Sequence, residues 1–248
     1  MQSEAVSRTI VNPLAVHKLS CQPEAHFWYK LFEIMAVLAG DRLGPYEILA
    51  PLGAGGMGEV YKARDIRLDR TVAIKILPEH IAQRPELRQR FEQEARSVAG
   101  LNHPHICVLH DIGNQDGTGY LVMEHIEGET LAARLERGPL PVDQALKFAT
   151  EIADALDHAH RAGFAHRDIK PANIMLTRVG VKILDFGLAK SVAKPVPAAE
   201  TLAATLTTEG TILGTPQYMA PEQFEGKAAD ARSDVWAFGA VRSLRRCP

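Results

Sequence analysis

Short apolar runs dominate the chain between residues 46 and 122 and predict β-strands. We expect strands over residues 46–52, 59–65, 71–77, 108–112 and 120–123. One segment differs, because residues 85–99 carry apolar side chains three or four positions apart, namely Leu87, Phe91, Ala95 and Val98. That spacing predicts one amphipathic helix among the strands.

From residue 130 onward the apolar pattern becomes that of helices. Residues 130–137 form the first helical stretch, and residues 141–162 form a longer one with an apolar side made of Ala145, Phe148, Ile152, Ala155, Leu156 and Ala159. Residues 190–210 are rich in Ala, Thr and Pro without periodicity, which predicts a loop. Strands followed by helices predict an α+β fold with an antiparallel sheet first and a mostly helical part second.

The composition excludes several classes of protein. The chain has 248 residues, of which 46% are hydrophobic and 23% charged, as in ordinary globular proteins. Its net charge of -2 gives no basic field, so we expect no nucleic-acid partner. The three cysteines are widely separated and support neither a disulfide framework nor a zinc site, which favours a cytoplasmic protein. The apolar run over residues 27–39 contains Lys30 and Glu33 and is shorter than the roughly 20 residues of a spanning helix, so we expect no membrane segment.

A glycine-rich segment precedes an apolar strand that ends in a lysine. Residues 53–60 read Gly-Ala-Gly-Gly-Met-Gly-Glu-Val, and residues 72–75 read Val-Ala-Ile-Lys. Glycines lack Cβ, so the backbone of such a hairpin can lie close to phosphate groups and offer them its N–H groups. A glycine-rich turn alone is a weak signal. The lysine that follows would add a point charge for the same phosphates.

Two acids, an amide and a second lysine are concentrated further along the chain. Residues 166–173 read His-Arg-Asp-Ile-Lys-Pro-Ala-Asn, and residues 185–187 read Asp-Phe-Gly. Phosphoryl transfer requires positioning and charge neutralisation more than covalent chemistry. An aspartate can orient a hydroxyl and accept its proton, while amide and carboxylate oxygens suit Mg²⁺.

In this order and at these spacings, the motifs resemble those of bacterial serine/threonine protein kinases of the Hanks, PknB-like type. The resemblance implies a two-lobed fold over residues 43–241, with an N-lobe over 43–123, a hinge over 124–128 and a C-lobe over 129–241. Residues 1–42 are then an extension that we expect to be disordered. We hypothesise that Met35 is the natural initiator, which peptides from before it in N-terminal mass spectrometry of the native protein would disprove.

The resemblance implies ATP and Mg²⁺ as cofactors and gives each motif residue a role. Asp168 would act on the substrate hydroxyl, with Lys170 beside the transferred phosphoryl group. Lys75 would bind the phosphates and pair with Glu94 of the helix, because residues 91–95 match the family pattern that precedes Leu-Asn-His-Pro at residues 101–104. The alternative acid, Glu92, lies about 200° around the helix from Glu94 and faces elsewhere. Asn173 and Asp185 would hold the metal. The implied ATP-binding positions are Leu52, Gly53, Ala54, Gly55, Gly56, Met57, Gly58, Glu59, Val60, Ala73, Lys75, Met123, Glu124, Ile126 and Met175.

The resemblance also implies regulation by phosphorylation. Arg167 would pair with a phosphate on the segment from Asp185 to Glu222, for which the candidates are Thr207, Thr208 and Thr211. Thr215 would contact the catalytic aspartate and favour hydroxyl substrates other than tyrosine. The implied partners are protein substrates that carry serine or threonine, with dimerisation for autophosphorylation left open. An apolar column would align helix and activation segment through Val98, Leu109, His166 and Phe186.

The resemblance ends within the helix that begins at Ser233. After Val241 the chain reads Arg-Ser-Leu-Arg-Arg-Cys-Pro, so residues 242–248 are interpreted as an aberrant tail and the C-lobe as lacking its last helices. We expect Glu222 to lack an arginine partner and the helix to expose apolar area. Two hypotheses stay open: an active ATP-dependent kinase, and an inactive or unstable fragment that at most binds nucleotide. A small-molecule kinase fits less well, because Lys170, Thr215 and the Ala-Pro-Glu motif favour a protein substrate.

Overall fold

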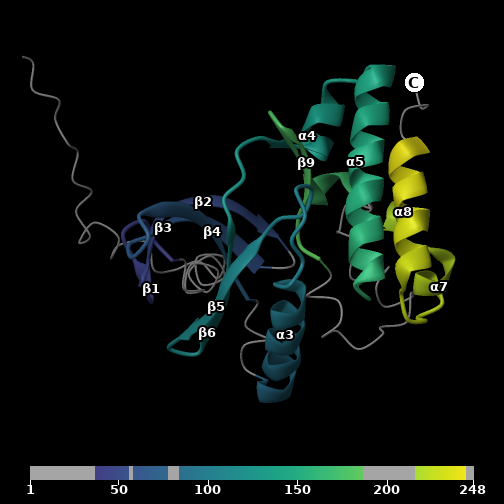
Figure 1. The fold of residues 1–248 in the computed structure, drawn as a ribbon. Coiled ribbons are helices and arrows are strands. Elements are labelled where there is room, and N and C mark those ends of the chain that lie inside the picture. Colours follow the sequence, from purple (N-terminus) through teal and green to yellow (C-terminus); the bar gives the residue numbers. More distant parts are fainter. Residues whose placement is uncertain (1–36, 56–57, 78–83, 187–215, 244–248) are drawn as a thin grey trace, which may run out of the picture. The chain divides into compact units, whose positions relative to one another are not determined.

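The computed structural model describes residues 37–55, 58–77, 84–186 and 216–243. The elements below all lie in the unit that runs from Ala39 to the end of the chain. Six strands in the described part form one antiparallel sheet, with the order β1-β2-β3-β4-β6-β5 (Figure 1). They are β1 Arg42–Leu43, β2 Tyr46–Gly55, β3 Gly58–Asp65, β4 Arg70–Ile76, β5 Leu109–Gln115 and β6 Thr118–Glu124.

The five strands predicted from the apolar runs correspond to β2 to β6, with ends that differ by a few residues. The sequence pattern missed the short β1, which begins one residue before the predicted start of the domain. The β5–β6 hairpin closes through Asp116 and Gly117, whose φ angles are 52° and 84°. Two consecutive left-handed residues match the right-handed twist of a tight hairpin, and Asp-Gly is a favoured pair for it.

The predicted amphipathic helix is α3, Pro85–Val98. Pro85 lies at its start, where the missing N–H costs no helical hydrogen bond. Phe91 and Ala95 are buried on one side of α3 and pack in a cluster with Leu77 and Leu121 of the sheet region. The three-to-four residue spacing therefore identifies the face of α3 that contacts the sheet.

The second part of the domain is mostly helical, as predicted. It contains α4 Leu131–Glu136, α5 Val142–Arg161, α7 Pro221–Phe224 and α8 Ala231–Ser243, with a small sheet of β7 Glu129–Thr130, β8 Ile174–Thr177 and β9 Gly180–Ile183. Two 3-10 turns, η2 Pro171–Asn173 and η3 Pro216–Tyr218, complete it. Figure 1 shows α5 and α8 running alongside each other. Helix α8 extends two residues past Val241, where the resemblance was placed to end.

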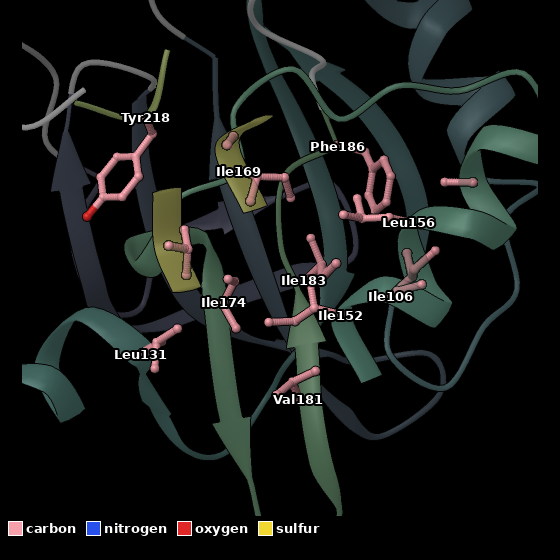
Figure 2. Close-up of a cluster of buried hydrophobic side chains, with 14 of the residues drawn as sticks. Ile106, Leu131, Ile152, Leu156, Ile169, Ile174, Val181, Ile183, Phe186 and Tyr218 are labelled. Carbon is pink, nitrogen blue, oxygen red and sulfur yellow. The ribbon is translucent and has the colours of Figure 1, made fainter. Parts of the chain in front are cut away.

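The largest apolar cluster lies where α5, α8 and the small sheet meet. Ile152 and Leu156 of α5 contact a core that includes Ile174 and Ile183 of the small sheet (Figure 2). The predicted apolar side of α5 is thus buried at its centre, whereas Val235 and Trp236 of α8 are 62% and 52% exposed. The expected exposure of apolar area on this helix is observed in the described residues.

Residues 105–108 join the two parts of the domain. The backbone of Ile183 exchanges hydrogen bonds with His105 and Cys107 at 2.8 and 2.9 Å, and Glu124 N–H donates to Val108 O at 2.9 Å. One extended segment therefore bonds both to β9 of the small sheet and to the end of β6. None of the helices described has the length and hydropathy that a bilayer crossing would need.

Candidate active site

The loop that leads into η2 surrounds the carboxylate of Asp168 with cationic and amide donors. Lys170 Nζ lies 2.8 Å from Asp168 Oδ2, and Asn173 Nδ2 donates to the same oxygen at 3.0 Å and to the Asp168 carbonyl at 2.9 Å. All three residues are buried or partly buried. The structure thus brings together three residues that the sequence predicted separately, and a positive charge lies beside the carboxylate that the sequence predicted to accept a proton.

Asp234 of α8 accepts hydrogen bonds from the backbone of this loop. Its two carboxylate oxygens accept from His166 N–H at 2.7 Å and Arg167 N–H at 2.6 Å, and His160 Nε2 lies 2.8 Å from Oδ2. Asp234 is completely buried. We did not assign a role to Asp234 or His160 from sequence, although an aspartate at the start of an apolar helix was a usable signal, since a buried acid requires partners.

Asn173 and Asp185 are held close together by the small sheet. Leu184 N–H donates to Asn173 O at 2.9 Å, and the next residues along each strand, Ile174 and Ile183, are paired across β8 and β9. Asn173 Nδ2 donates to Asp168, which leaves its amide oxygen available as a ligand. An amide oxygen just before β8 and a carboxylate just after β9 are a donor set that fits Mg²⁺.

Lys75 pairs with Asp185 and not with Glu94. Its Nζ lies 2.8 Å from Asp185 Oδ2, and among the described residues no ion pair joins Lys75 to the α3 glutamate. The Lys75–Glu94 pair is not formed in this conformation, and the role of Glu94 in catalysis stays a prediction. The spacing on α3 placed Glu94 correctly relative to its own helix but carried no information on which cation that helix faces.

The surroundings of Glu94 show where α3 directs it. Burial raises the pKa of Glu94, and the positive charge of Arg167 opposes that rise. Arg167 is the residue expected to receive a phosphate from the activation segment. Glu94 therefore lies within the field of the catalytic-loop arginine.

One face of the large sheet carries four of the predicted nucleotide-binding residues. Val60 lies opposite Lys75 in the β3–β4 register, and Ala73 lies opposite Met123 in the β4–β6 register, so these side chains share a face. Glu59 falls on the other face, where it accepts a hydrogen bond from Tyr61. The side chain of Glu59 is thus directed away from Lys75, and that of Ala54, opposite Glu59 in the β2–β3 register, lies on the same other face.

The glycine-rich hairpin is formed by the end of β2 and the start of β3. Gly53, Ala54 and Gly55 pair with Val60, Glu59 and Gly58, and the nearby Leu52 is half exposed. Gly56 and Met57 lie outside the described residues. The hairpin predicted to approach phosphate groups is therefore present, and its two strands continue directly into the sheet face that carries Lys75.

The hinge is tied to the small sheet by an ion pair that the sequence did not indicate. Lys182 of β9 lies 2.7 Å from Glu124 Oε2, and both side chains are partly buried. The Glu124 N–H is already bonded to Val108, so a ligand at this point would meet the Glu124 carbonyl. Met175 of β8, predicted to contact adenine, lies opposite Lys182 in the β8–β9 register, and Ile126 lies between the two sheets.

His166 and Phe186 form the centre of the predicted column. Their rings are 4.8 Å apart, and His166 Nε2 donates to Leu184 O at 2.7 Å while Nδ1 accepts from Asp168 N–H at 3.2 Å. Burial lowers the pKa of His166, which agrees with a neutral ring that donates at one nitrogen and accepts at the other. Val98 packs against the same core as Phe186, whereas Leu109 packs with the α3 cluster.

Glu222 accepts a hydrogen bond from a serine that the sequence did not indicate as its partner. The Ser233 hydroxyl donates to Glu222 Oε1 at 2.6 Å, and this hydrogen bond lowers the pKa of Glu222. The side chain is only partly buried, and among the described residues no ion pair joins Glu222 to an arginine. The phosphorylation candidates Thr207, Thr208 and Thr211, together with Thr215, lie outside the described residues.

A model of the family described as "Protein kinase domain" matches residues 46–243. The chain belongs to the protein kinase domain family. Its curated relatives include serine/threonine-protein kinase PknB of Mycobacterium leprae, 42% identical over 79% of this chain, and PrkC of Bacillus subtilis, 41% identical over 83%. This kinase domain spans 31% of the length of each of these two relatives.

The fold agrees with solved kinase domains. The crystal structure of the Mycobacterium tuberculosis PknI kinase domain is similar with a TM-score of 0.66 and 31% sequence identity, over 84% of this chain and 74% of that one. The predicted fold class, an antiparallel N-lobe sheet with one helix and a mostly helical C-lobe, is confirmed.

Proposed function

We propose that this chain transfers the γ-phosphoryl group of ATP to serine or threonine hydroxyls of proteins, with Mg²⁺. The observation that carries this proposal is the Asp168 carboxylate with Lys170 and Asn173 at 2.8 and 3.0 Å. Bacterial serine/threonine-protein kinases at 41–42% identity support the same activity. We further propose that the protein acts in the cytoplasm and that Thr207, Thr208 or Thr211 is phosphorylated.

Each residue contributes positioning or charge. Asp168 orients the acceptor hydroxyl and receives its proton at the carboxylate as the oxygen attacks phosphorus. Lys170 lies close enough to Asp168 to neutralise charge on the transferred group. Lys75, on the sheet face shared with Val60, binds the phosphates of the nucleotide whose base lies between the apolar residues of both lobes.

Asn173 and Asp185 would hold the metal ion. When bound, Mg²⁺ neutralises charge on the phosphates. Lys75 already neutralises Asp185 at 2.8 Å, so Asp185 would exchange part of this contact for the metal. Before nucleotide binds, the negative charge of Asp185 is thus balanced by the positive charge of Lys75.

The test is transfer of label from γ-labelled ATP by the purified chain, with Mg²⁺ and a basic model protein as acceptor, followed by phosphoamino-acid analysis. We expect phosphoserine and phosphothreonine with the wild type and with Asp143→Asn, an exposed carboxylate on α5. Asp168→Asn should reduce transfer at least about a hundredfold. Equal labelling by Asp168→Asn, or label on tyrosine only, would contradict the proposal.

The Lys75–Asp185 pair favours one second candidate, nucleotide binding without transfer, because Lys75 occupies a carboxylate that the proposed metal would need. In that case calorimetric titration with ATP and Mg²⁺ would show binding that Lys75→Met weakens, while no protein incorporates label. Incorporation that depends on Asp168 would exclude this candidate.

A further inference from the structure

Gln223 of α7 bridges two backbone segments with its side-chain amide. Its Nε2 donates to Arg167 O at 3.2 Å, and its Oε1 accepts from Ala220 N–H at 3.0 Å. A carbonyl can only accept and an N–H can only donate, so these two contacts together fix the orientation of the amide. Gln223 thus connects the end of the Ala-Pro-Glu segment with the catalytic loop.

The backbone that Gln223 contacts has an unusual conformation. Arg167 has a φ of 67°, in the left-handed region that non-glycine residues rarely adopt. Such a conformation persists where surrounding contacts hold it in place. The Arg167 N–H is held by Asp234 at 2.6 Å, and the Arg167 carbonyl is held by Gln223. The residue is therefore restrained from α8 on one side and from α7 on the other.

The Arg167 carbonyl belongs to the peptide bond between Arg167 and Asp168. Rotation of that peptide would displace the Asp168 carboxylate, although Asn173 and Lys170 would still contact it. Gln223, Asp168 and Tyr218 also line one small cavity. Asp234 cannot replace Gln223 here, because a carboxylate has no proton to donate to a carbonyl.

We infer that Gln223 is a positioning residue for phosphoryl transfer, which fixes the peptide before Asp168 and so couples α7 to the catalytic loop. The kinetic consequence rests on the proposed kinase function, but the structural consequence does not. A different role would be to cap α7 through Ala220 alone. The two roles can be distinguished by experiment, because only the contact with Arg167 requires a hydrogen-bond donor on the side chain of residue 223.

Two variants exploit this difference. Gln223→Glu keeps an acceptor for Ala220 N–H but loses the donor to Arg167 O, whereas Gln223→Met loses both. If Gln223 positions the loop, both variants should lower kcat by about tenfold, the value of one hydrogen bond, with the KM for ATP changed less than about twofold. Gln144→Glu, on the exposed surface of α5, should match the wild type.

Hydrogen exchange provides a measurement that does not require catalysis. Peptides that cover residues 165–170 should exchange faster in Gln223→Glu and Gln223→Met than in the wild type and Gln144→Glu, at temperatures well below each melting midpoint. Wild-type exchange and wild-type kcat in Gln223→Glu would overturn the inference and leave the capping role. If the wild type transfers no phosphate, the proposed function fails, while the exchange rates still decide whether Gln223 restrains the loop.

Discussion

The Lys75 ammonium lies 2.8 Å from the Asp185 carboxylate. This contact joins β4 of the N-lobe to the second residue after the end of β9. The two partners are not equally buried: the side chain of Lys75 is 8% exposed and that of Asp185 is 25% exposed. Loss of one partner therefore has different consequences from loss of the other, because only Asp185 can regain water.

We predict that Asp185→Ala destabilises the domain more than Lys75→Met. Asp185→Ala leaves an ammonium in a mostly dry site and should cost about 2–3 kcal/mol of unfolding free energy. Lys75→Met replaces the charge with an apolar chain of similar length and should cost less than about 1 kcal/mol, since Asp185 can be hydrated. Urea unfolding measures the loss of unfolding free energy in both variants. A larger loss in Lys75→Met than in Asp185→Ala would show that Asp185, and not Lys75, is the residue destabilised when its partner is removed.

Removal of the Asp234 carboxylate should be among the most damaging changes in the C-lobe. Asp234→Ala leaves His166 N–H, Arg167 N–H and His160 without their acceptor in a buried site, which we expect to cost about 3–5 kcal/mol. The matched control is Asp157→Ala on α5, because Asp157 is 55% exposed and its ion pair among the described residues is with Arg161, one helical turn away. That change should cost less than about 0.5 kcal/mol. Similar losses for the two variants in urea unfolding would mean that Asp234 contributes no more than a surface ion pair.

The sequence predicted elements and motif residues better than their partners. The period of apolar positions located β2 to β6, α3 and α5, because burial of one face forces that period. It could not locate β7 or α7, which are too short for a period to emerge. Partner choices such as Lys75 with Asp185, Glu222 with Ser233 and Lys182 with Glu124 depend on how separate elements pack in three dimensions. Spacing along the chain carries no information on such contacts.

Gly128 in the hinge should tolerate no side chain. A Cβ at this position would lie 2.1 Å from the Leu176 carbonyl oxygen, and the φ of 158° adds strain for any L-residue. Gly128→Ala must therefore separate the hinge from β8, and we expect it to lower the melting temperature by several degrees and to weaken ATP binding. Gly239→Ala is the control, because a Cβ there meets open space within α8 and alanine should stabilise the helix by up to about 1 kcal/mol. An unchanged ATP affinity in Gly128→Ala would show that the hinge can shift without effect on the nucleotide site.

Acid should destabilise the domain through His166. Burial lowers its pKa in the folded state below the ordinary 6.5, and Nδ1 is occupied as the acceptor of the Asp168 N–H. The unfolded chain therefore binds more protons than the folded one as pH falls through about 6.5, and folding stability decreases in that direction, by at most about 1.4 kcal/mol per pH unit for one group. The stability from this group is fully present above that pH and is lost progressively below it.

His166→Phe isolates this contribution, because the histidines whose folded pKa is also lowered by burial, His103, His110 and His125, remain in place. Phenylalanine keeps the ring contact with Phe186 but cannot be protonated. Urea unfolding at pH 7.5, 6.5 and 5.5 should therefore give a smaller loss of stability on acidification for His166→Phe than for the wild type, although the variant is less stable at pH 7.5. Equal losses would mean that His166 does not titrate in this range, and that the acid sensitivity of the domain arises from other groups.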